Sequence, residues 1–200
     1  MGRDAEETRR RLLRAATEEF AERGLAGARV DRIAAAAGAS KPLLYTYFGN
    51  KDDLFDAVYN RVIADFVLET PLDPYDLPGY AAQLFDRSVT HPELIRLTFW
   101  DRLERGGQGA RQPVVLETNR NKVAAIQRAQ DAGGIADRFP AGELLLLITT
   151  LAATWAFAQL GPDGPGTGDV ETPRATLVRA IRLLIEQDVS ADPGRAAPNH

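Results

Sequence analysis

The segment Val30–Asp53, with the sequence VDRIAAAAGASKPLLYTYFGNKDD, decides the fold of this chain. Its first part, Val30–Ala37, has apolar residues at helical spacing, and Gly38 ends this helix because glycine adopts a left-handed backbone at little steric cost. Ser40 is a good N-cap for a second helix, whose first turn tolerates Pro42. Two short helices joined by a three-residue turn with glycine are typical of the helix-turn-helix, whose second helix enters the DNA major groove.

The charges in this segment favour contact with phosphate. No Asp or Glu occurs in the 20 residues from Arg32 to Lys51, although the chain holds 28 acidic residues in 200. Lys41 lies in the first turn of the second helix, where the helix dipole favours acids over bases. A helix start with a hydroxyl cap, free N–H groups and a lysine suits a phosphate group.

The outward face of the second helix supplies the candidate DNA contacts. At about 100° per residue, Leu44 and Phe48 share the inner face and are expected to pack on Ile33. Tyr45 and Tyr47 flank the outer face, where phenol hydroxyls can reach phosphates; the alternative is that they only cover a small core. Apolar outer residues would read bases through thymine methyl groups. The predicted DNA contacts are Arg29, Ser40, Lys41, Pro42, Leu43, Tyr45, Thr46, Tyr47 and Lys51.

Residues 33–54 follow the pattern I-A-x-x-A-G-x-S-K-x-x-L-Y-x-Y-F-x-x-K-x-x-L. The matching positions are Ile33, Ala34, Ala37, Gly38, Ser40, Lys41, Leu44, Tyr45, Tyr47, Phe48, Lys51 and Leu54. Because of this pattern, the chain resembles the DNA-binding domain of the tetracycline-repressor (TetR) family of bacterial transcription regulators. The resemblance covers roughly the first 60 residues. Arg29 departs from the family, which usually has a Ser or Thr cap there. Leu43 and Thr46 stand at positions that vary within the family, so the resemblance carries no operator sequence.

The rest of the chain shows helical patterns without strands, so the predicted fold class is all-α with about nine helices. We predict a three-helix helix-turn-helix domain over residues 1–50, a helical regulatory, ligand-binding and dimerisation domain over 51–189, and a disordered tail over 190–200. A helix from Lys51 to about Glu69 would join the two domains. Further helices are predicted over residues 4–23, 79–89, 92–105, 113–132, 141–160 and 173–188, with a capping box at Thr90–Glu93.

Composition narrows the possible functions. The chain has no cysteine and two distant histidines, which disfavours thiolate chemistry and a histidine metal site, and no cofactor is expected. Residues 1–50 hold nine Lys and Arg against seven Asp and Glu, whereas the remainder holds 15 against 21. A basic head with an acidic body limits nonspecific DNA affinity. No signal segment starts the sequence, which predicts a cytoplasmic protein.

The last two predicted helices suggest how two chains pair. The uncharged run of 17 residues from Leu144 to Leu160 is at the lower margin for a membrane span, but a buried helix without membrane contact is favoured. The final helix carries an apolar stripe, and two such helices from each chain would form a four-helix interface, as the resemblance also implies. The predicted interface residues are Leu147, Thr150, Leu177, Ile181 and Leu184.

The resemblance also implies a small-molecule site in the body. We predict a pocket for an apolar or amphipathic effector lined by Phe99, Trp100, Leu103, Leu151, Thr154 and Trp155. Thr149, Thr150, Thr154 or Gln159 would offer polar contacts, and the alternative is that the aromatic residues are plain core.

These features favour a ligand-responsive homodimeric regulator, in this family usually a repressor, that binds a palindromic operator in double-stranded DNA and releases it when the effector binds. An all-α enzyme is disfavoured because the carboxylate pairs, such as Glu18 with Glu19, lie on exposed helix turns. A helical protein-interaction module that has lost DNA binding is the remaining alternative.

Overall fold

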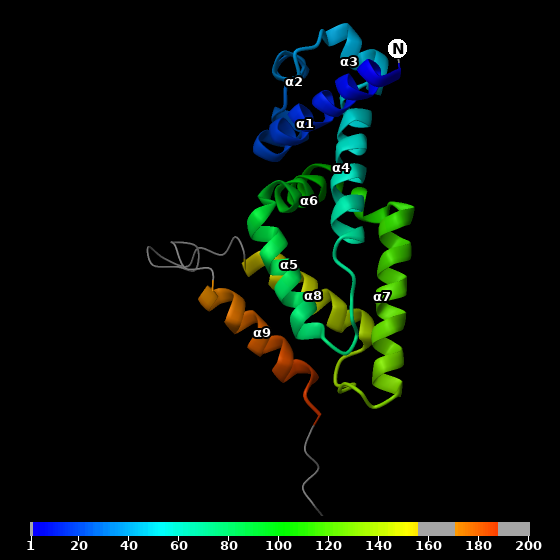
Figure 1. Ribbon diagram of the computed structural model, residues 1–200, viewed down its shortest axis with the longest axis vertical. Helices are drawn as coiled ribbons and strands as arrows, with labels where there is room; N and C mark the ends of the chain where they lie inside the picture. The colour runs from blue at the N-terminus through cyan, green and yellow to red at the C-terminus, as the bar shows by residue number, and fades with distance from the viewer. Residues whose placement is uncertain (1, 156–170, 188–200) are drawn as a thin grey trace, which may run out of the picture.

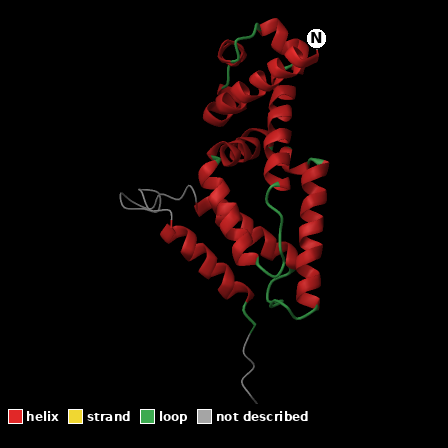
Figure 2. Cartoon of the chain, viewed as in Figure 1, coloured by secondary structure: helices red, strands yellow, loops and turns green. Residues whose placement is uncertain are grey.

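The computed structural model describes residues 2–155 and 171–187. Within these ranges the chain forms nine α-helices, one short 3-10 helix and no strand, which confirms the all-α fold class (Figures 1 and 2). The elements are α1 (Gly2–Gly27), α2 (Val30–Ala36), α3 (Lys41–Phe48), α4 (Lys51–Leu68), α5 (Leu77–Thr90), α6 (Pro92–Arg105), η1 (Gly109–Arg111), α7 (Pro113–Asp131), α8 (Ala141–Trp155) and α9 (Glu171–Ile185). The predicted tail and the last residues of the predicted helix 141–160 lie outside the described residues.

Local signals in the sequence set the ends of the DNA-binding helices. The Ser40 hydroxyl accepts a hydrogen bond from the N–H of Leu43 at 3.3 Å, and the Asn50 side chain accepts one from the N–H of Asp53 at 2.9 Å. Gly38 has φ 62°, a left-handed conformation that ends the first helix of the motif. The predicted α2, α3 and α4 are therefore confirmed to within a residue or two.

The predicted capping box before α6 is wrong. Thr90 is the last residue of α5, and its hydroxyl donates back to the carbonyl of Asp86 at 3.0 Å. His91 precedes α6 without a side-chain cap hydrogen bond. The two helices meet at one residue, so the threonine is used by the helix before it.

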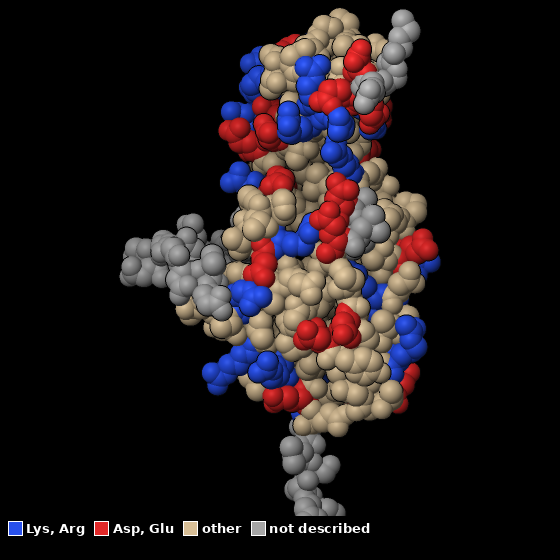
Figure 3. Space-filling view, in the orientation of Figure 1, with Lys and Arg blue, Asp and Glu red and all other residues tan. Residues whose placement is uncertain are grey.

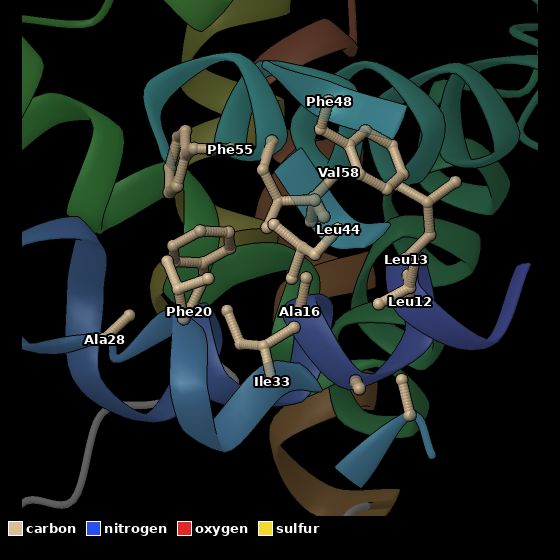
Figure 4. Packing of buried hydrophobic residues seen from close by; sticks show 14 of the residues in the cluster. Leu12, Leu13, Ala16, Phe20, Ala28, Ile33, Leu44, Phe48, Phe55 and Val58 are labelled. Atoms are coloured by element: carbon tan, nitrogen blue, oxygen red, sulfur yellow. The ribbon is translucent and has the colours of Figure 1, made fainter. Parts of the chain in front are cut away.

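The first hydrophobic core lies under α2 and α3. Figure 4 shows Phe20 of α1 next to Phe55 of α4, and their ring centroids are 5.1 Å apart. Ile33 and Leu44 are fully buried in this core, as the helical spacing predicted. The core also contains Leu97 of α6, so it extends beyond the first 50 residues into the body.

The second core fills the body between α5, α7, α8 and α9. Its fully buried members include Leu77, Ile126, Ile148 and Ile181. No described helix has both the length and the apolar character that a membrane crossing requires.

Two helices connect the cores. In Figure 1, α4 runs from the DNA-binding helices into the body, and α6 lies between α1 and the rest of the body. The Trp100 indole of α6 donates to the carbonyl of Ala21 at 3.3 Å, and Arg105 of α6 pairs with Asp56 of α4 at 2.7 Å. The head, which we define as α1 to α3, is thus held by side chains of α4 and α6.

Candidate DNA interface and ligand cavity

Helix α3 lies at the end of the molecule that is farthest from the body (Figure 1). Its predicted outward residues are exposed, with 38% of Leu43 and 39% of Tyr45 accessible to solvent. Pro42 and Thr46 are exposed as well, and the Thr46 hydroxyl donates to the Pro42 carbonyl at 3.0 Å. These side chains form a surface that a DNA groove can reach.

The cations around α3 are engaged within the chain. The Lys41 ammonium lies 3.0 Å from a carboxylate oxygen of Asp31, and this hydrogen bond raises the pKa of Lys41. The Lys51 ammonium donates to the carbonyl of Ala26 at 3.3 Å. Both pairs are accessible enough for a phosphate to replace the protein partner.

Tyr47 is half-buried against the first core, and its hydroxyl donates to the carbonyl of Ala5 at 3.1 Å. This placement favours the alternative that Tyr47 covers the core, and it leaves Tyr45 as the more accessible phenol. In Figure 3 uncharged side chains form the tip of the head, and Lys and Arg side chains lie below them with acidic neighbours.

Glu19 of α1 fixes the start of α2, where Arg29 provides no side-chain cap. The Glu19 carboxylate accepts the N–H of Arg29 at 2.9 Å and the Nε–H of Arg32 at 2.8 Å. Burial alone would raise the pKa of Glu19, but the hydrogen bonds from Arg32 and Arg29 outweigh it and the pKa is lowered. Arg29 itself is exposed. Sequence reasoning missed Glu19, because its role depends on how α1 crosses α2.

A cavity of about 510 Å³ lies in the body between α4, α5, α6, α7 and α8. This volume is within the range of small-molecule pockets. Most of the lining is apolar. The lining residues are Tyr59, Ile63, Phe66, Tyr80, Leu84, Ser88, Leu94, Ile95, Thr98, Val115, Asn119, Lys122, Val123, Gly142, Leu145, Leu146, Thr149 and Ala153.

Most of the aliphatic hydroxyl groups in this lining already donate hydrogen bonds within their own helices. Ser88, Thr98 and Thr149 each donate to a carbonyl one turn earlier in their own helix, at 2.7 to 2.9 Å. Thr149, which the sequence indicated as a polar contact, does line the cavity. Burial raises the pKa of Tyr59 and of Tyr80 to about 12, so both phenols remain protonated.

Lys122 of α7 is the charged residue of this lining, and sequence reasoning missed it. Its ammonium donates to the Tyr80 hydroxyl at 2.9 Å and to the Thr70 carbonyl at 3.4 Å. Burial lowers the pKa of Lys122. The sequence did contain an indication of this residue, because Lys122 shares one face of the helix with Val115, Asn119 and Val123. All four residues line the cavity.

Of the predicted pocket residues whose side chains the structure describes, none is among the residues that line this cavity. Phe99 and Leu103 lie on the outer side of α6, with 48% and 76% of their surfaces exposed, and Trp100 packs against α1. Leu151 packs against the second core and Thr154 is exposed. The side chain of Trp155 and the whole of Gln159 lie outside the described residues. The crossing of α6 with α1 turns Phe99, Trp100 and Leu103 away from this cavity, and a role for the predicted residues in ligand binding stays a prediction.

The predicted dimer residues are divided between two environments. Leu177 and Ile181 are fully buried in the chain's own second core, which leaves them no exposed surface for a partner chain. Their stripe on α9 packs on α5 instead. Leu184 packs partly on the same core, Leu147 is half-buried, and Thr150 is exposed. A role for these three in dimerisation stays a prediction.

The fold and site together define a helix-turn-helix DNA-binding protein with a ligand-sized cavity in its helical body. Residues 12–58 match the family described as bacterial regulatory proteins, tetR family, and residues 76–182 match the family described as tetracyclin repressor-like, C-terminal domain. The chain belongs to the TetR family of bacterial transcriptional regulators, and like its homologues it is not an enzyme.

The similarity to known proteins extends over most of the chain. The HTH-type transcriptional repressor SCO4008 of Streptomyces coelicolor is 40% identical over 192 residues, which cover 92% of this chain and 98% of that protein. The structure of SCO4942 from Streptomyces coelicolor is 38% identical and superposes with a TM-score of 0.79, covering 89% of this chain and 98% of that one. A TetR family transcription regulator from Marinobacter aquaeolei has the same fold, with a TM-score of 0.71, 22% identity and coverage of 94% and 100%.

Proposed function

We propose that this chain is a homodimeric transcriptional repressor that binds a palindromic operator through α3 and releases it when a small molecule occupies the cavity. The 40% identical relative is named as a repressor, which supports the direction of regulation. DNA contact is assigned to the exposed face of α3 and to the cations beside it, Lys41, Lys51 and Arg29.

The observation that carries the proposal is that the same two helices form the cavity wall and hold the head. Tyr59 of α4 lines the cavity and also belongs to the first core. On α6, Leu94 and Thr98 line the cavity, while Leu97 is buried in the first core. A molecule that moves either helix therefore moves the head.

The size of the response follows from linkage. A ligand changes DNA affinity only by the difference between its affinities for the DNA-binding and the released states. Coupling free energies of this kind are typically about 1–3 kcal/mol, which corresponds to a change of roughly 5- to 150-fold in operator affinity.

Dimerisation is assigned to the outward faces of α8 and α9. Thr150 of α8 is exposed and Leu147 is half-buried, and on α9 Leu183 has 56% of its surface exposed. A two-fold axis between two such bodies presents two α3 helices to one side of a duplex. The two helices would then be separated by at least one turn of the duplex, ~34 Å.

The DNA-binding part is tested with 30-base-pair duplexes that tile the region upstream of the protein's own gene. Fluorescence anisotropy at low and physiological salt is expected to find one duplex that is bound in a ratio of two chains, or a multiple of two, per duplex. A chain that is monomeric by light scattering and binds none of the duplexes would instead support the protein-interaction alternative.

The cavity part is tested with two neighbouring valines of α7. Val115 lines the cavity, whereas Val114 is 41% exposed and is not among its lining residues. Val115→Trp places a permanent occupant in the cavity and is expected to lower operator affinity, while Val114→Trp leaves it unchanged. Equal operator affinities for both variants and the wild type would contradict the coupling.

A further inference from the structure

The cavity holds one cation that no acid neutralises within the described part of the chain. Lys122 is half-buried, and its two hydrogen-bond partners, Tyr80 and the Thr70 carbonyl, are both neutral. The pKa of Lys122 is lowered by burial, and no nearby charge contributes to the shift. The ammonium also lies 5.0 Å from the centroid of the Tyr80 ring. These neutral groups compensate the charge only in part, so this end of an otherwise apolar cavity suits an anion that enters from outside.

Lys122, Tyr80 and Asn119 can each offer a hydrogen-bond donor to a molecule in the cavity. An ammonium has three N–H donors, and two of those of Lys122 are used by Tyr80 and Thr70, which leaves one. The Tyr80 hydroxyl accepts from Lys122, so its own proton is free to be donated, and its pKa of about 12 keeps that proton in place. Asn119, one turn before Lys122 on the same face of α7, adds an amide.

On this geometry, which rests on the proposed ligand response, we propose that the effector is a monoanionic amphipathic molecule. Its carboxylate lies against Lys122, Tyr80 and Asn119, and its apolar chain extends along Ile63, Leu84, Ile95 and Leu145. The single cation sets the charge of the ligand, because a dianion would leave one negative charge uncompensated among these apolar side chains.

Straight-chain octanoate and 1-octanol are the probes, since they share a chain length and differ in the charge of the head. Titration calorimetry on the full-length protein is expected to find octanoate bound about 10- to 100-fold more tightly than 1-octanol, the range for a charge-assisted hydrogen bond. Lys122→Met keeps an unbranched side chain of similar size and removes the charge, so the preference for octanoate should disappear. Arg120→Met, an exposed cation of α7 outside the cavity lining, is the matched control and should keep the preference.

A purely structural role for Lys122 is separated by a second measurement. If Lys122 only links α7 to Tyr80 and Thr70, Lys122→Met lowers the melting temperature and weakens octanoate and 1-octanol equally. A ligand anchor predicts an unchanged or higher melting temperature of the free protein, because an uncompensated buried charge is removed.

The inference is overturned if 1-octanol binds as tightly as octanoate, if neither binds at millimolar concentration, or if Lys122→Met retains the preference. In each of these cases the response of operator affinity to Val115→Trp still decides the proposed function. Conversely, octanoate that binds in the predicted way but leaves operator affinity unchanged would uphold the ligand class and refute the proposed regulation.

Discussion

Glu104 of α6 joins the body to the head through backbone groups, and its removal is predicted to loosen that junction. Gly24 has φ 70° and interrupts α1, so the turn after it has N–H groups without partners in the preceding helix. One carboxylate oxygen of Glu104 accepts the N–H of Leu25 at 2.6 Å and that of Ala26 at 3.1 Å. A carboxylate at this position caps the turn as an N-cap side chain would.

The cost of Glu104→Ala is estimated from these two hydrogen bonds. Hydrogen bonds to charged groups contribute about 1.5–3 kcal/mol each where water is excluded, but this site is exposed and water can replace the carboxylate. We therefore expect the free energy of unfolding to fall by about 1–2 kcal/mol, the range for the loss of a helix cap. Glu104→Gln keeps an acceptor oxygen and should lose less.

Urea unfolding followed by circular dichroism measures this change. Glu117→Ala, which removes an exposed carboxylate of α7, is the control. The same variants are then compared for the response of operator affinity to octanoate, which should weaken in Glu104→Ala because α6 holds the head less firmly. An unfolding free energy equal to that of Glu117→Ala, together with an unchanged response, would refute the role of this junction.

Three further substitutions test the head and the cavity wall. The pKa of Glu19 is lowered on folding from the usual 4.5, so its stabilisation is present above that pH and is lost as the pH falls through the folded value. Glu19→Gln should therefore lower the free energy of unfolding by about 1–2 kcal/mol at pH 7. It should also flatten the acid side of a plot of melting temperature against pH, and an unchanged acid side would contradict this role of Glu19. Lys41→Ala, which removes an exposed pair with Asp31, should leave stability nearly unchanged. In anisotropy titrations it should also reduce the salt slope of operator binding by about 0.9, and an unaltered slope would exclude a phosphate contact. A Cβ on Gly109 would lie 2.3 Å from the Tyr59 ring, so Gly109→Ala should cost about 1–3 kcal/mol in urea unfolding and weaken octanoate binding, whereas wild-type values would show that the ring moves freely.

The head was predictable from the sequence because its signals are local. Ser40 and Asn50 cap helices through their own side chains, and Gly38 and Gly49 take positive φ where those helices end. The inner face of α3 followed from helical spacing alone, which placed Leu44 on the buried side.

The cavity was not predictable in the same way, because it depends on how helices cross. An apolar stripe shows that a face is buried but does not show which helix covers it. The stripe of α9 with Leu177 and Ile181 is covered by α5 of the same chain, and the aromatic residue Trp100 is covered by α1. Lys122 lies on the largely apolar face of α7, and this position of a cation indicates the cavity better than the aromatic residues of α6 do.

The central claim is that α3 presents its exposed face to an operator, and Leu43→Glu tests it most directly. Leu43 is 38% exposed, so a glutamate there leaves the core intact but brings a negative charge to the DNA backbone. Anisotropy with the duplex identified from the upstream region should find operator binding weakened by more than about 100-fold at an unchanged melting temperature. Operator binding equal to that of the wild type would contradict the account.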